Sequence, residues 1–354
     1  MIKRGSSVKS IRIPQRGYEM KKIIASLLVL ILLIGCTGCG KKQKSLLGDY
    51  QSKDSVIHSD IGAQVEARYA PLLSQFFICN VTHDMLATDY VFDEEKPDRK
   101  GCVFVINRTK NKLVFGYRMD ELFCPASITK LMTALVTLNR CSTDEKVVIT
   151  KEMAEFSRGS VEELKEGDVL TVHDLLLCML VSSANNAAVA LAIHVAGSEA
   201  AFVELMNQEM KKLGGLNTNF VNASGLHDDK HRTTPYDMYI VYQECTKYKE
   251  FREIMTYTEK RYNYVDATGA QRARTVRTTN CFKLNDPQHH YDYPNSIAIL
   301  GGKTGTTNSA GYCMILHVKN SFGTEYIVGV FRAETEAKLY NNLNDLLSTY
   351  CVAE

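Results

Sequence analysis

The sequence lacks the excess of positive charge with which proteins bind nucleic acids. Its 354 residues have a formal net charge of +2, but residues 1–35 alone hold seven Lys or Arg and one acidic residue. The rest of the chain carries 35 basic and 39 acidic side chains, a net charge of −4. A mildly acidic domain has no electrostatic footprint for DNA or RNA, so no nucleic-acid partner is expected.

Internal repeats and low-complexity tracts are also absent from the sequence. Hydrophobic residues make up 45% of the chain and charged residues 23%. These proportions are ordinary for one large globular domain or for two closely packed lobes.

The N-terminal apolar run is too short to span a bilayer comfortably. Ile23–Gly35 has thirteen residues and follows a Lys-Lys pair, which is typical of a signal peptide. Leu33–Cys36 resembles a bacterial lipobox, in which the cysteine receives lipid and becomes the mature N-terminus. We therefore expect export to the outer face of the cytoplasmic membrane, with lipid on Cys36. Cleavage without lipid and an uncleaved anchor are the alternatives.

Three segments are expected along the chain. Residues 1–35 are a leader and signal peptide, residues 36–61 a polar tether, and residues 62–354 a single folded domain. The basic stretch before Met20 is long for a signal peptide, so Met20 is a candidate start. A detected peptide covering residues 10–19 would contradict a start at Met20.

A disulfide framework is not expected, although the chain has eleven cysteines. After Cys36 and Cys39, the other nine are odd in number and never have C-x-x-C spacing. Most of them, such as Cys178 and Cys313 inside apolar runs, should be buried thiols that pack as small hydrophobic groups.

Residue patterns predict strand-rich ends around a helical middle. Helices are expected from Pro125, at Thr171–Val181 behind a Thr171–Asp174 capping box, at Glu199–Leu213 and at Glu336–Tyr350, with a weaker signal at Val65–Phe77. Strands are expected at Cys102–Asn107, Leu113–Tyr117, Ser296–Thr304, Ala310–His317 and Glu325–Phe331. Short links between sequential strands favour an antiparallel sheet, flanked by helices and carrying an inserted helical lobe, in an α/β chain of the α+β type.

The first motif with chemical meaning is Ser127-Ile128-Thr129-Lys130. A serine hydroxyl needs a base within hydrogen-bonding reach, and a lysine three residues later lies on the same helical face. The lysine accepts a proton only if burial or a nearby cation lowers its pKa, and Lys303 is the candidate cation. The string alone is weak evidence, because Ser6–Lys9 matches it too.

Two further motifs follow in order. Ser183-Ala184-Asn185 lies in a small polar segment, where a tight turn would let both polar side chains face one cleft. There Ser183 could relay a proton and Asn185 could bind an amide carbonyl. Lys303-Thr304-Gly305 ends a predicted strand, whose edge could pair with an extended peptide while the glycine permits close approach. The lysine and threonine would hold a carboxylate.

The order and context of the three motifs resemble the low-molecular-mass penicillin-binding proteins, the D-alanyl-D-alanine carboxypeptidases of serine peptidase family S11. The resemblance covers Cys102 to Tyr350. It rests also on Pro125-Ala126-Ser127, Ser183–Leu191, Asn222–His227 and Gly301–Gly305. It implies a serine DD-peptidase or β-lactamase-like fold, a peptidoglycan stem peptide as substrate, β-lactams as covalent inhibitors, and no cofactor.

Site roles follow from the resemblance residue by residue. It implies Ser127 as nucleophile, Lys130 as base and Ser183 as proton relay. It implies that Asn185, Lys303, Thr304 and Gly305 bind substrate, and that the backbone N–H groups of Ser127 and Thr306 form the oxyanion hole.

Three departures from the family pattern are visible. Asn186 stands where relatives commonly have Asp, and Asp286–Asn295 resembles an extra loop, so both bear on substrate preference. The chain ends about fifty residues after the third motif, so we expect no C-terminal β-domain or anchor helix, and the N-terminal anchor would replace that tether.

Metal binding is a weaker interpretation. His227, Asp228, Asp229 and His231, with His289-His290 downstream, have suitable ligand chemistry. Two histidines four apart bind zinc together on one helix face, and the glycine and proline around this segment argue against a helix. No metal is expected.

Two rival functions remain open. A class A-like β-lactamase needs a glutamate in an E-x-x-L-N element, and the sequence offers only Glu204–Asn207, one residue short and inside a helical pattern. A catalytically silent lipoprotein that binds cell-wall peptides is the second rival, and the intact Ser127, Lys130 and Lys303 argue against it.

Overall fold

The computed structural model describes residues 101–353 apart from 216 and 285. The chain divides into two units, Met1–Asp60 and Ile61–Glu354, and all of the described residues belong to the second. The predicted signal peptide, Cys36, the tether and the helix at Val65–Phe77 lie outside the described residues.

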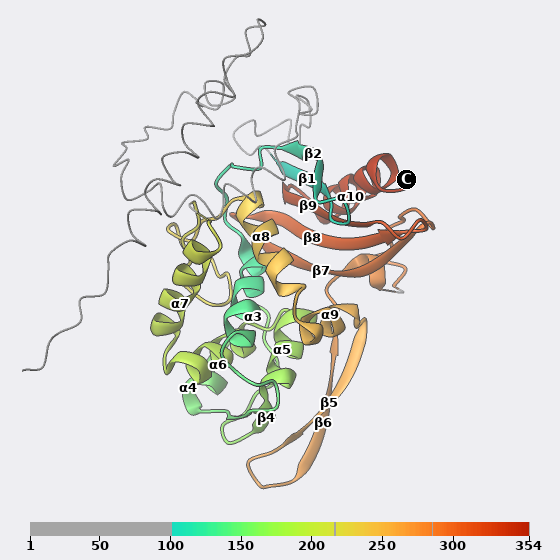
Figure 1. Ribbon diagram of the computed structural model, residues 1–354. Helices are drawn as coiled ribbons and strands as arrows, with labels where there is room; N and C mark the ends of the chain where they lie inside the picture. The colour runs from blue at the N-terminus through green and yellow to red at the C-terminus, as the bar shows by residue number, and fades with distance from the viewer. Residues whose placement is uncertain (1–100, 216, 285, 354) are drawn as a thin grey trace, which may run out of the picture. The chain divides into compact units, whose positions relative to one another are not determined.

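A five-stranded antiparallel sheet forms one half of the described domain (Figure 1). Its order is β2-β1-β9-β8-β7, which places β7 at an edge. The strands are β1 (Cys102–Asn107), β2 (Lys112–Tyr117), β7 (Ile297–Thr307), β8 (Gly311–Asn320) and β9 (Glu325–Ala333). All five predicted strands are confirmed, and β7 continues beyond the predicted end at Thr304.

Alternation along β1 shows why the sheet is buried on both faces. Val103 and Val105 join the hydrophobic cluster that contains Leu339 and Leu343 of α10 (Glu336–Tyr350). Residues of the opposite parity, such as Phe104, pack into the cluster of the helical lobe. Because side chains alternate across a strand, a continuous apolar run serves two cores at once.

The helical lobe is inserted between β2 and β7. The capping box predicted at Thr171 is present, since Thr171 Oγ1 accepts from the N–H of Asp174 while the Asp174 carboxylate accepts from the N–H of Thr171. The helices are α3 (Lys130–Leu138), α4 (Lys151–Glu155), α5 (Val172–Val181), α6 (Asn185–Ala196), α7 (Glu199–Lys212), α8 (Pro235–Cys245) and α9 (Lys249–Thr256).

Helices α4, α6, α8 and α9 and a second sheet were not predicted. The first eight residues of α6 are all buried, so no polar face gives the sequence a helical period. The second sheet, β3-β4-β5-β6, is antiparallel, and its strands are short or largely exposed, which weakens any alternation of apolar and polar residues. Its strands are β3 (Lys146–Val148), β4 (Val169–Thr171), β5 (Glu259–Val265) and β6 (Gln271–Arg277).

Within the described residues, no single helix is long and apolar enough to cross a bilayer. Of the eight cysteines described, six are buried and all are free thiols, which confirms the expected packing role of Cys178 and Cys313.

Candidate active site

Ser127 lies in a short 3₁₀ turn, η2 (Ala126–Thr129), that runs directly into α3. The sequence predicts an α-helical first turn here, and the tighter 3₁₀ turn is the correction. Residues i and i+3 eclipse one another in a 3₁₀ turn, so Ser127 and Lys130 still share a face. Their side chains are in contact, with Lys130 Nζ 2.8 Å from Ser127 Oγ.

Lys130 is fully buried and has three polar neighbours. Besides Ser127 Oγ, its Nζ lies 2.6 Å from Asn185 Oδ1 and 2.7 Å from the carbonyl oxygen of Ser224. As an ammonium it donates to all three. As a neutral amine it donates to the amide and the carbonyl, which cannot donate back, and its lone pair faces the serine hydroxyl.

Burial lowers the pKa of Lys130 well below its ordinary value, and the positive charge of Lys303 lowers it further. Among the described residues, no ion pair includes either lysine, so no carboxylate restores the charge of Lys130. The cation proposed from the sequence as the neighbour of Lys130 therefore acts on it as expected.

Lys303 joins the second and third motifs. Its side chain is 1% exposed, and its Nζ donates to Ser183 Oγ and to the carbonyl oxygen of Thr304, both at 2.9 Å. Burial lowers the pKa of Lys303 to about 7. Ser183 has a φ of +63°, a left-handed conformation that non-glycine residues seldom adopt. Such strain concentrates at functional sites, where the surrounding contacts hold it in place.

The edge strand β7 packs against the turn that carries Ser127. A methyl group at Gly305 would lie 3.0 Å from the backbone nitrogens of Ser127 and Ile128, so a side chain there would push the strand away from the turn. One residue before it, Thr304 Oγ1 is 2.5 Å from Thr279 Oγ1. Sequence reasoning missed Thr279, which belongs to no recognisable motif.

The Asn222–Gly225 turn supports Ser127 from the other side. Asn222 Oδ1 accepts from the N–H groups of Ser224 and Gly225, which presents the Ser224 carbonyl to Lys130. Gly225 has a φ of +86°, and any side chain there would collide with the carbonyl of Ala126. In the sequence, Asn222–His227 contributes only to the family resemblance; the structure shows that its first four residues form this turn.

Asn185 and Asn186 fasten a loop beside the site. Asn185 Nδ2 donates to the carbonyl of Arg158, and Asn186 exchanges two hydrogen bonds with the backbone of Glu162. An aspartate at position 186 would lose the donor of one bond. Asn186, which stands where relatives commonly have Asp, therefore holds the 158–162 loop through the two hydrogen bonds of a neutral amide.

The proposed metal ligands near His227 do not converge. His231 is buried, its Nδ1 accepts from the N–H of Val221 and its Nε2 therefore donates to Thr129 Oγ1. Burial lowers its pKa to about 4, which keeps the imidazole neutral. The segment is not helical, as expected, and His227 lies 3.6 Å from the exposed Asp229.

Two other features noted in the sequence lie in structural contacts. Asn207 of the Glu204–Asn207 string exchanges two hydrogen bonds with the backbone of Phe220, while Glu204 is exposed on α7. In the Asp286–Asn295 loop, His289 pairs with Glu336 at the start of α10, and Tyr291 stacks on Tyr340.

A serine hydroxyl in contact with a buried lysine of lowered pKa, beside a second buried lysine on a sheet edge, defines an active-serine acyl-transfer hydrolase. A family model described as D-alanyl-D-alanine carboxypeptidase, peptidase S11, matches residues 94–335, and the chain belongs to this family.

Relatives of this chain include both carboxypeptidases and endopeptidases. It is 32% identical over 236 residues to the D-alanyl-D-alanine carboxypeptidase DacF of Bacillus subtilis, covering 65% of this chain and 57% of that protein. It is 30% identical to the D-alanyl-D-alanine endopeptidase of Escherichia coli, covering 61% and 66%. The chain thus spans less than two thirds of the length of either relative.

Solved structures agree on the fold. A Streptomyces K15 DD-transpeptidase structure superposes with a TM-score of 0.64 at 23% identity, covering 70% of this chain and 95% of that one. The serine DD-peptidase fold expected from the resemblance is therefore confirmed.

Proposed function

We propose that the chain is a serine-type D-Ala-D-Ala carboxypeptidase, which removes the terminal D-alanine of peptidoglycan stem pentapeptides through an acyl-enzyme on Ser127. The observation that carries the proposal is the environment of Lys130. Its amine is buried, lacks a carboxylate partner among the described residues, and is 2.8 Å from Ser127 Oγ. A lysine in these surroundings can act as a general base near neutral pH.

Acylation then proceeds by proton transfer to this base. Ser127 Oγ attacks the carbonyl carbon between the two D-alanines while its proton moves to Lys130 Nζ. Collapse of the tetrahedral intermediate breaks the C–N bond, and Ser183 is the relay proposed to deliver a proton to the leaving amine. Water then hydrolyses the ester, which releases the shortened peptide and restores Ser127.

The edge of β7 is the proposed substrate-binding element. Lys303, with Thr304, would hold the terminal carboxylate of the peptide. That carboxylate would be the counter-ion that the buried Lys303 ammonium lacks in the free protein. The close packing of Gly305 on Ser127 supports an oxyanion hole from the N–H groups of Ser127 and Thr306, as the resemblance implies. Asn185, besides orienting Lys130, would bind the amide carbonyl of the peptide.

β-Lactams should acylate Ser127 and remain attached. A class A-like β-lactamase activates its deacylating water with a glutamate, and the glutamate of the nearest matching string, Glu204, is exposed on α7. A long-lived adduct is therefore expected.

Fluorescent penicillin labelling tests the proposal. The purified protein should form a stable adduct that Ser127→Ala abolishes, with Ser309→Ala as a matched serine control. Absence of an adduct and of D-alanine release would favour the silent binding protein. Turnover of the adduct within seconds would favour the β-lactamase.

Peptide assays separate the two activities found among the relatives. Release of free D-alanine from a pentapeptide ending in D-Ala-D-Ala is expected. Cleavage of cross-linked peptides without release of D-alanine from the pentapeptide would instead assign an endopeptidase.

We also propose that the protein is tethered to the outer face of the cytoplasmic membrane through lipid on Cys36. The Leu33–Cys36 string after the apolar run is the support. Cys36→Ala should move the protein from the membrane fraction to the soluble fraction and remove a labelled fatty acid. Retention of the fatty acid would contradict lipidation at Cys36.

A further inference from the structure

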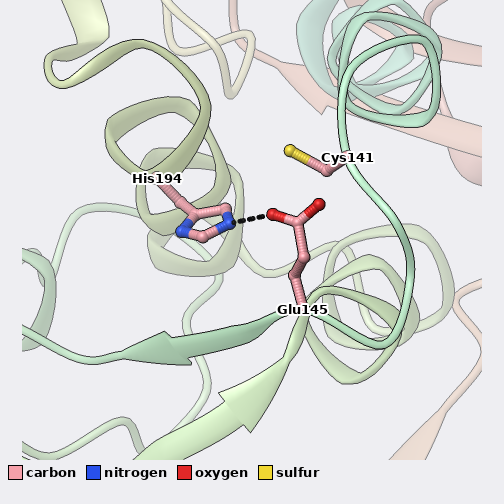
Figure 2. A group of neighbouring side chains, drawn as sticks. All are labelled: Cys141, Glu145 and His194. Atoms are coloured by element: carbon pink, nitrogen blue, oxygen red, sulfur yellow. Dashed lines mark hydrogen bonds and ion pairs between the residues drawn. The ribbon is translucent and has the colours of Figure 1, made fainter.

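Three potential metal ligands meet at the end of the helical lobe opposite Lys130. Cys141, Glu145 and His194 place their donor atoms within 4.8 Å of one another, and Glu145 Oε2 lies 3.1 Å from His194 Nε2. Figure 2 shows the first two on the segment between α3 and β3, facing His194 in the last turn of α6. The side chains of Glu145 and His194 are 44% and 22% exposed, so solvent ions can reach them.

The donor set and its spacing suit a borderline-soft divalent ion. Tetrahedral zinc binds thiolate, imidazole and carboxylate at about 2.0–2.3 Å, which sets ligand atoms about 3–4 Å apart. Small side-chain rotations would bring the three donors to that separation and leave a fourth position for water. Glu145 Oε1 accepts from the N–H of Ser142 at 2.7 Å. This hydrogen bond holds the carboxylate in place and leaves Oε2 to bind an ion.

Two helix ends add favourable electrostatics. The N–H of Cys141 caps the C-terminus of α3 by donating to the carbonyl of Thr137, and Gly197 caps the C-terminus of α6. The C-terminal end of a helix carries partial negative charge and favours a cation. Arg140 is the opposing charge. Burial and then the Glu145 carboxylate raise the pKa of the Cys141 thiol, and Arg140 offsets part of that increase.

A second cluster with the same donor types provides an internal comparison. Cys281, His289 and Glu336 also converge, but Glu336 stands in the first turn of α10. The positive end of that helix favours the carboxylate and disfavours a cation. Glu336 Oε1 also accepts from both His289 and the hydroxyl of Tyr291.

We propose that Cys141, Glu145 and His194 bind Zn²⁺ or a similar transition-metal ion. The ion would join the C-terminal ends of α3 and α6, the two helices whose N-terminal residues, Lys130 and Asn185, are hydrogen-bonded in the active site. The metal site would thus hold α3 and α6 together at the ends opposite Lys130 and Asn185. It stands independently of the peptide substrate.

Cobalt binding tests the site in the metal-free, reduced full-length protein. Titration with Co²⁺ should give a thiolate-to-cobalt charge-transfer band that Zn²⁺ displaces. Cys141→Ser and His194→Gln should bind one equivalent fewer, or bind that equivalent at least about 100-fold more weakly, because each removes a ligand. Cys281→Ser should bind as the wild type does.

The proposal is overturned if Cys141→Ser matches the wild type in stoichiometry and affinity, or if Cys281→Ser loses the band instead. Melting temperatures of the metal-free variants should equal that of the metal-free wild type, which excludes misfolding. In the wild type and in Cys281→Ser, but not in Cys141→Ser or His194→Gln, Zn²⁺ should raise the melting temperature. Penicillin labelling of the metal-free protein would remain, so failure here is distinguishable from failure of the proposed peptidase activity.

Discussion

Two buried lysines face the candidate active site from different elements, and they differ in their surroundings. Lys130 on α3 has a hydroxyl, an amide oxygen and a carbonyl around Nζ, so every position is taken by protein. Lys303 on the edge strand contacts one hydroxyl and one carbonyl. The surroundings of Lys130 suit a general base that accepts and returns a proton. Those of Lys303 suit a cation that binds an anionic ligand.

Removal from water lowers the pKa of both lysines. The charge of Lys303 further lowers the pKa of Lys130. A bound carboxylate beside Lys303 would favour its charged form. Substrate binding would then keep the ammonium at one lysine and help to keep the amine at the other.

Replacement of each lysine by arginine should separate the two roles. Lys130→Arg keeps the charge but cannot be deprotonated, so acylation by penicillin should fall roughly 10²–10⁴-fold. Lys303→Arg should lose much less, because a guanidinium also holds carboxylates. Rates of penicillin labelling measure both variants. Equal losses of labelling rate would show that Lys130 and Lys303 do not have these separate roles as base and as carboxylate-binding cation.

Removal of the Lys303 charge should move the pH dependence of acylation. If Lys130 is the base, the wild-type rate should rise with pH as Lys130 becomes neutral. Without the neighbouring cation the pKa of Lys130 increases, so in Lys303→Met this rise should occur at higher pH, together with weaker binding of the peptide carboxylate. Acylation rates across pH provide the measurement, and an unmoved profile would exclude coupling between the two lysines.

The buried charge at Lys303 should also cost stability. Its pKa is about 7 in the folded protein and near 10.5 when unfolded, so between these values the unfolded chain binds the additional proton and wild-type stability rises with pH. Lys303→Met should raise the free energy of unfolding at pH 7 by roughly 1–4 kcal/mol, and this gain should shrink towards pH 10. Urea unfolding at several pH values would reveal it; a less stable variant would mean that Lys303 is a net stabilising group.

Asn186→Asp is the smallest of these changes. It removes the donor to the Glu162 carbonyl and buries a charge at a side chain that is 2% exposed, which should cost about 1–3 kcal/mol. Asn341→Asp, at an exposed position of α10, should stay within about 0.5 kcal/mol. Comparable melting temperatures for the two variants would show that the 158–162 loop does not depend on the amide.

The parts of the fold that the sequence predicted are those in which a clear period extends over a whole element; α9 is amphipathic but has only eight residues, and it was missed. The strands of the large sheet, the capped α5, and helices α7 and α10 all combine an apolar pattern with recognisable ends. Helix α6 is nearly all buried, and β5 and β6 are largely exposed, so neither shows a contrast between two faces. For the site, local spacing was sufficient to pair Ser127 with Lys130.

By itself, the sequence determined the three motifs, their order and the reaction class they favour, because these depend on residue type and on separations of one to three positions. Only the tertiary structure decided that Lys130 is buried without a carboxylate, that Lys303 lies near enough to lower its pKa, and that Ser224, Thr279 and the 158–162 loop belong to the site. Burial and charge act through space, across elements distant in the chain. The meeting of Cys141 with His194 was decided in the same way.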